Sequence, residues 1–217
     1  MTPDLFAAVE GPESRLQPLG PGAVVLRGFA LPEEAALLAG LQDVIAAAPF
    51  RHMFTPGGFR MSVATTNCGS LGWVTDRTGY RYDAIDPDSG DRWPPMPAAF
   101  LQLAKKAAGQ AGFDGFGPDS CLVMRYEPGA RLSLHQDKNE RDLGAPIVSV
   151  SLGIPAVLLF GGTKRTDRTV RVPLNHGDVV VWGGPARLRY HGVMPPAEGH
   201  HPLVGDRRIN LSFRTAG

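Results

Sequence analysis

The second half of this chain is a series of short apolar segments with alternating or β-branched residues, separated by glycine and proline turns. Eight such segments follow Ser120, and they cover residues 121–126, 131–137, 146–152, 156–160, 169–174, 178–182, 188–192 and 208–214. Short strands at this close spacing are typical of β-sandwiches and jelly rolls. The sequence therefore predicts a mainly β protein.

The first half predicts two helices that flank this β core. Residues 32–49 begin with a proline and two acids and continue with leucines at helical spacing, and residues 100–108 repeat that spacing. Residues 1–21 lack any period and are predicted to be an amino-terminal arm. One domain is expected over residues 22–217, within which the irregular residues 50–97 are expected to be functional.

Composition excludes several classes of protein. The formal net charge of +1 is not that of a bulk polyanion binder. The longest apolar stretches are far shorter than the roughly 20 residues that span a bilayer, and no secretory signal is visible at the amino terminus. Two cysteines cannot form a disulfide framework. We therefore expect a soluble, cytoplasmic protein without membrane contact, and a monomer because no dimer signal is visible.

The sharpest local signal is the tripeptide His135-Gln136-Asp137 in the alternating segment 131–137. In a strand, residues i and i+2 point to the same face, so His135 and Asp137 would project together. A second histidine would complete the 2-His-1-carboxylate set of non-haem iron enzymes. His191, 54 residues beyond Asp137, is the candidate. The competing interpretation is a surface histidine and aspartate in a turn.

The remaining histidines are expected to be structural. His176-Gly177-Asp178 repeats the spacing, but its Gly-Asp pair precedes a strand and is typical of a turn. His200 and His201 lie in a proline-rich loop, and His52 stands alone. We expect these to be surface or core-edge histidines.

The carboxy-terminal strand 208–214 carries Arg208, Asn210, Ser212 and Arg214 on one face. Two guanidinium groups inside a small barrel would be costly without an anion. A dicarboxylate co-substrate would satisfy both through bidentate ion pairs. The alternative is an exposed edge strand with solvated arginines.

Together these segments resemble the AlkB family of iron(II)- and 2-oxoglutarate-dependent dealkylases, and most closely its bacterial DNA-repair branch. The resemblance runs from about residue 20 to the end. The matching motifs are residues 55–58, 67–69, 125–126, 128–130, 132–138, 147–153, 176–184, 190–192 and 208–214.

The resemblance implies a double-stranded β-helix, or jelly roll, in which His135, Asp137 and His191 bind Fe(II). It also implies that Arg208 pairs with the distal carboxylate of 2-oxoglutarate, helped by Tyr126 and Asn210. Arg214 would bind the carboxylate nearer the metal.

The same resemblance implies how a nucleic acid would bind. Trp73 would stack on an extruded base, Tyr80 would contact the neighbouring backbone, and Asn139 would lie at the base edge. An aromatic face compensates for the stacking that an extruded base loses. Three basic residues are candidates for phosphate or base-edge contacts, with a solvated surface position equally open: Arg77, Lys138 and Arg165.

The implied function is oxidative demethylation of N-alkylated bases, of the 1-methyladenine and 3-methylcytosine type, in single-stranded DNA or RNA. Formaldehyde would be released while 2-oxoglutarate and O2 become succinate and CO2. Two alternatives remain: an Fe(II)/2-oxoglutarate hydroxylase of a small molecule or protein, and a non-catalytic jelly-roll binding module.

The chain departs from the family pattern near the substrate. Met124 replaces an asparagine that donates to the co-substrate, and Asn139 replaces an acid at the base edge. Phe59 and Thr65 stand where tyrosine and methionine are usual. The loss of the acid at residue 139 predicts a weaker preference for cationic lesions.

Overall fold

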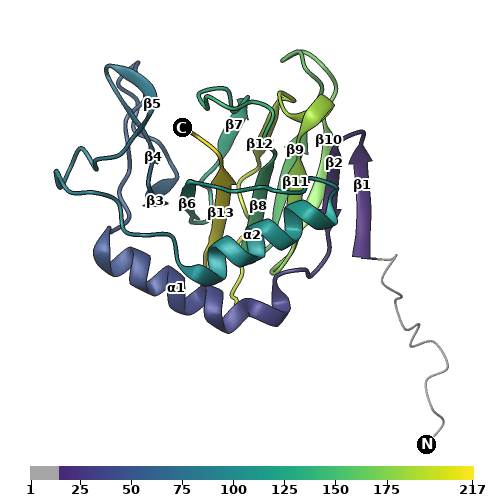
Figure 1. Cartoon of the computed structure of the whole chain (residues 1–217), viewed down its shortest axis with the longest axis horizontal. Coiled ribbons are helices and arrows are strands. Elements are labelled where there is room, and N and C mark those ends of the chain that lie inside the picture. Colours follow the sequence, from purple (N-terminus) through teal and green to yellow (C-terminus); the bar gives the residue numbers. More distant parts are fainter. Residues whose placement is uncertain (1–14) are drawn as a thin grey trace, which may run out of the picture.

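The computed structural model describes residues 15–217 (Figure 1). The helical elements are η2 (Leu31–Glu33), α1 (Glu34–Ala47), α2 (Ala98–Gln110) and η3 (Gly184–Ala186). The strands are β1 (Leu16–Gly20), β2 (Ala23–Leu26), β3 (Ala64–Gly69), β4 (Gly72–Asp76), β5 (Gly79–Asp83), β6 (Ser120–Tyr126), β7 (Leu132–His135), β8 (Ile147–Gly153), β9 (Ala156–Phe160), β10 (Val170–Leu174), β11 (Val179–Trp182), β12 (His191–Val193) and β13 (Arg208–Arg214).

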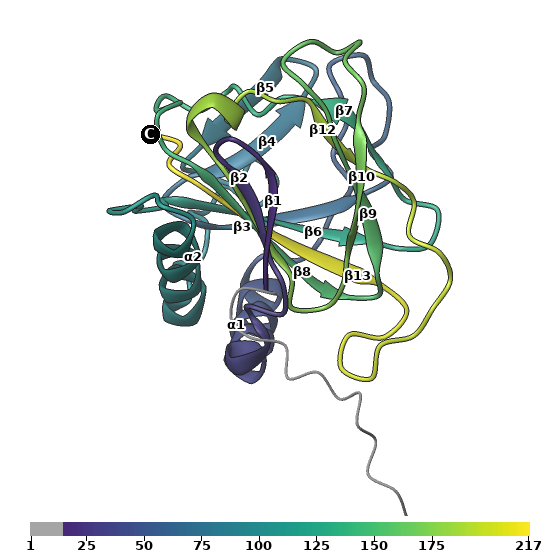
Figure 2. The same ribbon diagram turned by 90° about the vertical axis from the view of Figure 1, so that its right-hand side faces the viewer.

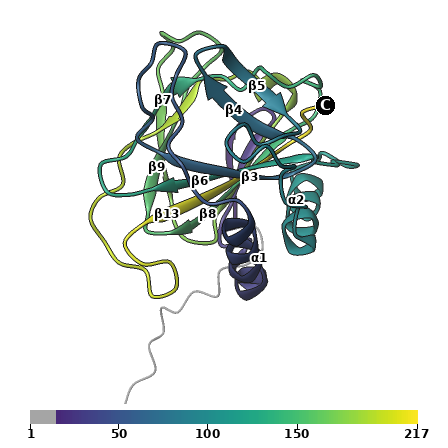
Figure 3. The same ribbon diagram turned by 90° about the vertical axis from the view of Figure 1, so that its left-hand side faces the viewer.

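Most strands belong to two antiparallel sheets. The large sheet has seven strands in the order β1-β2-β11-β8-β13-β6-β3, and the small sheet has four in the order β10-β9-β12-β7. Strands β4 and β5 form a separate hairpin. Figure 2 shows α1 and α2 on one side of the large sheet and the small sheet on the other. Figure 3 shows the β4–β5 hairpin on the side away from the helices.

The inner strands of the large sheet are buried on both faces, and their side chains divide between two cores. In β11, Val179 and Val181 pack toward the helices, whereas Val180 and Trp182 pack toward the small sheet. This period of two follows from the alternation of side chains along a strand. A strand covered on both sides is apolar throughout, which explains the uninterrupted valines.

The predicted fold class, mainly β with flanking helices around a jelly-roll core, is confirmed by the two facing sheets and the two helices. Strand β13 is central and its residues are buried, so the alternative of an exposed edge strand is wrong. Its apolar face, Ile209, Leu211 and Phe213, packs toward the helices. Its polar face therefore lies toward the interior between the sheets.

Three local predictions differ from the structure. Residues 16–20 form β1, which pairs with β2, although the sequence predicted an arm up to residue 21. Residues 1–14 of that arm lie outside the described residues. Residues 64–69, 72–76 and 79–83 form strands β3, β4 and β5 inside the segment expected to be irregular. Residues 188–190 are not a strand, because the η3 turn delays β12 until His191. No helix within residues 15–217 is long and apolar enough to cross a membrane.

Candidate metal and co-substrate site

The structure brings His135, Asp137 and His191 together. His135 ends β7 and His191 begins β12, and the two residues are directly paired in the register of these antiparallel strands. Asp137 lies beyond the end of β7, and its Oδ1 is 3.5 Å from His135 Nε2 while its Oδ2 is 3.7 Å from His191 Nε2. One ligand atom from each residue lies within 4.8 Å of the others. This set can hold one metal ion and leave further coordination positions open.

The backbone selects the nitrogen that each imidazole offers. Nδ1 of His135 lies 2.8 Å from the carbonyl oxygen of Ser133, and Nδ1 of His191 lies 3.1 Å from that of Arg189. A carbonyl only accepts, so each Nδ1 carries a proton, and in the neutral rings each Nε2 has a free lone pair. Metal-binding histidines are oriented in this way by their second nitrogen.

A second cluster, formed by Glu34, His176 and His201, has similar spacing but the opposite tautomers. Nδ1 of His176 accepts the N–H of Gly153 at 2.8 Å, and Nδ1 of His201 accepts that of Leu203 at 3.3 Å. In the neutral rings the proton therefore sits on Nε2, which in His176 donates to Glu34. The geometry agrees with a structural role for these histidines and not with a metal site.

The charges around Asp137 favour its ionised form. Burial would raise the pKa of Asp137, but Arg214 and the two imidazoles outweigh this effect and hold the pKa well below its usual range. Burial and the neighbouring His135 lower the pKa of His191 to about 4. An ionised carboxylate and a neutral imidazole are the forms that bind a metal.

Arg208 and Arg214 project from β13 into the same interior. The Arg208 side chain is buried, with Nη2 bonded to Ser151 Oγ at 2.9 Å and the guanidinium 5.0 Å from the Tyr126 ring centre. Among residues 15–217, Nε and Nη1 of Arg208 and Nη1 of Arg214 have no hydrogen-bond partner. A buried guanidinium with free donors is costly unless an anion binds it. These orphaned donors fit the dicarboxylate co-substrate expected from the sequence.

The other two expected co-substrate residues line the same space. Asn210 uses its Nδ2 to donate to Ser149 Oγ and to the Val150 carbonyl, both at 2.8 Å. The hydroxyl of Tyr126 lies 3.6 Å from Met124 Sδ, so the thioether occupies the position beside the tyrosine. The missing amide at residue 124 is thus replaced by a weak acceptor.

The three candidate metal ligands and the four candidate co-substrate residues line one cavity of about 870 Å³. The cavity extends from the histidines to Trp73 and Tyr80, whose rings stack with centres 5.7 Å apart. Asn67 fixes Trp73 by bonding both its N–H and its carbonyl, at 3.0 and 3.1 Å. Tyr80 is half-exposed at the mouth. Two aromatic side chains of the β4–β5 hairpin therefore line the same cavity as the three candidate metal ligands.

Most expected substrate residues also reach this cavity. Asn139, Lys138 and Arg165 line it, and Arg165 Nη1 donates to the Leu134 carbonyl at 2.7 Å. Phe59 and Thr65 line it as well. Arg77, which lies in the turn between β4 and β5, is not part of its wall.

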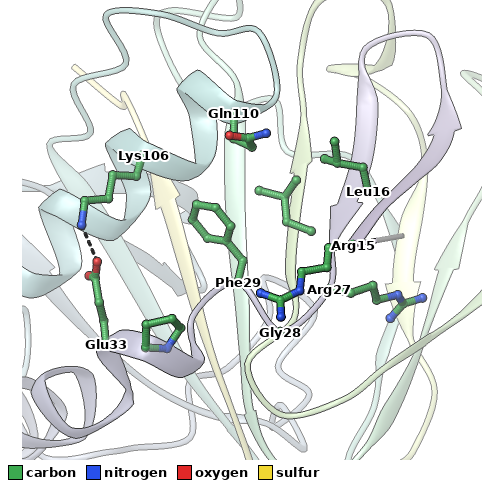
Figure 4. A pocket seen from close by; sticks show the side chains of 10 residues that line it. Arg15, Leu16, Arg27, Gly28, Phe29, Glu33, Lys106 and Gln110 are labelled. Atoms are coloured by element: carbon green, nitrogen blue, oxygen red, sulfur yellow. Dashed lines mark hydrogen bonds and ion pairs between the residues drawn. The ribbon is translucent and has the colours of Figure 1, made fainter. Parts of the chain in front are cut away.

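A second hollow of about 530 Å³ lies between the β1–β2 hairpin and the helices (Figure 4). Among its charged side chains, Lys106 pairs with Glu33 and Arg27 pairs with Asp178, and Arg15 also lines it. It contains no histidine or cysteine. Neither cluster of candidate metal ligands found among residues 15–217 lies in it, so the larger cavity is the candidate active site.

Three residues near the site were missed from the sequence: the partly buried Tyr82 and the buried Glu140 and Arg187. The Glu140 carboxylate accepts the Tyr82 hydroxyl at 2.6 Å and pairs with Arg187 at 3.1 Å and Arg214 at 3.2 Å. In sequence, Arg187 follows Gly-Pro-Ala and Glu140 lies in a charged run, so both are typical of solvated loops. No sequence pattern marked them.

Comparison with known proteins is consistent with this geometry. The family model of the 2OG-Fe(II) oxygenase superfamily matches residues 22–214. The alpha-ketoglutarate-dependent dioxygenase AlkB of Escherichia coli (strain K12) is 56% identical over 214 residues, covering 99% of this chain and 98% of that protein. An AlkB homolog of Caulobacter vibrioides is 46% identical, covering 83% of this chain and 79% of its own.

A solved structure, that of OsALKBH1, superposes with a TM-score of 0.80 at 30% identity and covers 92% of this chain and 99% of its own. The extent of these matches assigns the chain to an enzyme family and excludes the non-catalytic binding module. The chain belongs to the AlkB family within the 2OG-Fe(II) oxygenase superfamily, and it is an Fe(II)- and 2-oxoglutarate-dependent dioxygenase.

Proposed function

We propose that this dioxygenase is an oxidative demethylase of N-alkylated bases, of the 1-methyladenine and 3-methylcytosine type, in single-stranded DNA or RNA. The observation that carries the proposal is the single cavity that joins the His-Asp-His cluster to the stacked Trp73 and Tyr80. More distant relatives are named nucleic acid dioxygenase ALKBH1 in Mus musculus and DNA N(6)-methyladenine demethylase ALKBH1C in Arabidopsis thaliana.

The proposed ligands of Fe(II) are His135, Asp137 and His191. The free Nε2 atoms and the ionised carboxylate support this assignment. Bound there, the metal with 2-oxoglutarate and O2 supplies the oxidising power that hydroxylates an N-methyl group. The hydroxymethyl product then loses formaldehyde and restores the base, while succinate and CO2 leave.

The protein's own residues position the co-substrate. We assign the distal carboxylate of 2-oxoglutarate to Arg208, helped by Tyr126 and Asn210, and the carboxylate nearer the metal to Arg214. The free donors of Arg208 lie in a buried environment, where a bidentate ion pair is strong because water does not compete. Arg214 also holds Asp137 Oδ2 at 2.7 Å, so the same side chain orients a proposed iron ligand.

The depth of the cavity supports the proposed preference for single strands. A methylated base must leave its helix to reach a metal inside the cavity, and unstacking is less costly in a single strand. We assign stacking on the base to Trp73, contact with the neighbouring backbone to Tyr80 and the base edge to Asn139. Arg165 and Lys138 at the wall would contact phosphate.

We also propose that residues 22–217 form one catalytic domain that works as a monomer in the cytoplasm. One hydrophobic core joins both helices to the large sheet, and a second core joins the large sheet to the small sheet. The buried free cysteines Cys68 and Cys121 suit a reducing compartment.

The test is turnover on a panel of methylated oligonucleotides, with formaldehyde and repaired base measured in the same samples. We expect one formaldehyde for each repaired base. The His135→Ala variant should lose both products, whereas the control His201→Ala, which removes a histidine outside the cavity, should retain them. Succinate formation that methylated oligonucleotides do not stimulate would indicate a small-molecule or protein substrate instead.

A further inference from the structure

The proposed iron ligand Asp137 lies on an irregular segment. Strand β7 ends at His135 and β8 begins at Ile147, and residues 136–146 form neither helix nor strand. A ladder of sheet hydrogen bonds therefore cannot hold Asp137 in place. Precise metal sites need supporting contacts that fix their ligands.

Arg187 supplies such contacts from the turn after η3. Its side chain is 3% exposed. Nη1 donates to the Asp137 carbonyl at 2.6 Å and Nε donates to the Ala145 carbonyl at 3.0 Å. One rigid guanidinium thus bonds to both the beginning and the end of segment 136–146.

The third contact of Arg187 extends to the co-substrate side. Its Nη2 lies 3.1 Å from Glu140 Oε2, and Glu140 Oε1 lies 3.2 Å from Arg214 Nε. Arg214 in turn binds the carboxylate of Asp137. Two buried arginines therefore alternate with the buried Glu140 and the largely buried Asp137 in one network, in which opposite charges lie next to one another.

We propose that Arg187 is a positioning residue for Fe(II) and 2-oxoglutarate. It fixes the backbone of Asp137 directly and the guanidinium of Arg214 through Glu140, and it contacts neither metal nor substrate itself. The inference rests on the ligand set given under the proposed function. Replacing Arg187 removes both carbonyl contacts and leaves Glu140 with less positive charge around it.

The experiment uses three variants of the full-length protein: Arg187→Met, Arg187→Lys and, as matched control, Arg27→Met. Arg27 makes the same kinds of contact, with Asp178 at 2.5 Å and the Pro173 carbonyl at 2.7 Å, but it lines the other hollow. Fe(II) is titrated without oxygen in the presence of 2-oxoglutarate, and the visible charge-transfer band reports binding. Amide hydrogen exchange of residues 136–146 is measured in the metal-free protein.

We expect Arg187→Met to weaken Fe(II) binding by about tenfold or more, as loss of supporting contacts does at other metal sites. Exchange within residues 136–146 should accelerate in the same variant. Arg187→Lys keeps the charge but has a single nitrogen for three acceptors. Its Fe(II) affinity and its exchange rates should therefore lie between those of Arg187→Met and the wild type. Arg27→Met should lower thermal stability but leave Fe(II) affinity and exchange of this segment unchanged.

The outcomes distinguish failure of the proposed ligand set from failure of the positioning role of Arg187. If the wild type gives no band, the proposed ligand set is wrong. If the wild type gives the band and Arg187→Met binds Fe(II) with the same affinity, the positioning role is overturned. If Arg187→Met does not fold, the Arg187→Lys variant is the test. Wild-type Fe(II) affinity together with wild-type amide exchange of residues 136–146 in Arg187→Lys would also overturn the positioning role.

Discussion

At the scale of single residues, the direction of one ring nitrogen separates two histidine clusters with the same spacing. His135 and His191 place Nδ1 against carbonyls, whereas His176 and His201 place Nδ1 against N–H groups. The sequence predicted a ligand role for the first pair and structural roles for the second from their settings. The reason for the difference lies in backbone groups that become neighbours only after folding.

Asn139 bears on which lesions are preferred. It is exposed on the cavity wall, and the next residue, Glu140, is turned inward onto Arg187 and Arg214. Glu140 therefore cannot replace the missing carboxylate at the base edge. We predict that Asn139→Asp raises kcat/KM for cationic lesions relative to neutral ones by about fivefold, because a charge-assisted hydrogen bond is about 1 kcal/mol stronger than a neutral one.

The measurement compares 1-methyladenine with a neutral methylated base in otherwise identical oligonucleotides. Gln102→Glu, which adds the same charge on the exposed face of α2, serves as control and should leave the ratio unchanged. Equal turnover of both lesions by the wild type and by Asn139→Asp would contradict the prediction.

At the scale of elements, the β4–β5 hairpin depends on its turn. The Asp76 carboxylate accepts the Thr78 N–H at 2.7 Å, the Thr78 hydroxyl at 2.5 Å and Arg81 Nη1 at 2.9 Å. The Thr78 hydroxyl and N–H, followed by Arg81, lower the pKa of Asp76 to about 2. The lowered pKa means that this stabilisation is present above about pH 4 and is lost as the pH falls toward 2.

We therefore predict that Asp76→Ala loosens the β4–β5 hairpin and raises KM for methylated oligonucleotide by about two- to fivefold, because the turn loses the carboxylate that accepts these three hydrogen bonds. Fe(II) and 2-oxoglutarate affinity should not change, because their proposed ligands lie on other strands. Asp91→Ala removes the same charge from the nearby irregular segment and controls for electrostatic repulsion of phosphate. A KM shift of the same size in both variants would show that charge, not the turn, is responsible.

Much of the element order was predictable because strand alternation is a local property. Strand β13 is the clearest case: its apolar and polar faces were correctly separated, and the polar face points into the cavity. Strand β1 was missed because its residues have little alternation, and strands β3, β4 and β5 were missed because they lie in a segment with little regular period. Strand β3 is also held by β6, a partner far along the chain. Asp137 lies beyond the end of β7. The alternation of side chains along a strand therefore predicted that Asp137 lies near His135, but not that Arg187 and Arg214 hold it in place. Arg187 and Glu140 needed the folded structure, since their contacts join distant segments.

At the scale of the whole molecule, the site bridges the two sheets. The proposed iron-binding histidines belong to β7 and β12 of the small sheet, and the arginines belong to β13 of the large one. Fe(II) alone would order the small-sheet side, and 2-oxoglutarate alone would satisfy Arg208. Bound together at one position, they would connect the two sheets.

We predict that adding Fe(II) and 2-oxoglutarate together without oxygen raises Tm by more than the sum of the separate shifts. A ligand at about 100 times its Kd adds about 2.7 kcal/mol to the stability of the folded state, which corresponds to about 5–10 °C for a chain of this size. A chelator should reverse the gain. Arg208→Met should retain the shift caused by Fe(II) and lose the extra gain, because the distal carboxylate has no other buried cation assigned to it. Strictly additive shifts in the wild type would mean that metal and co-substrate bind independently, and the two sheets would then not be coupled through this site.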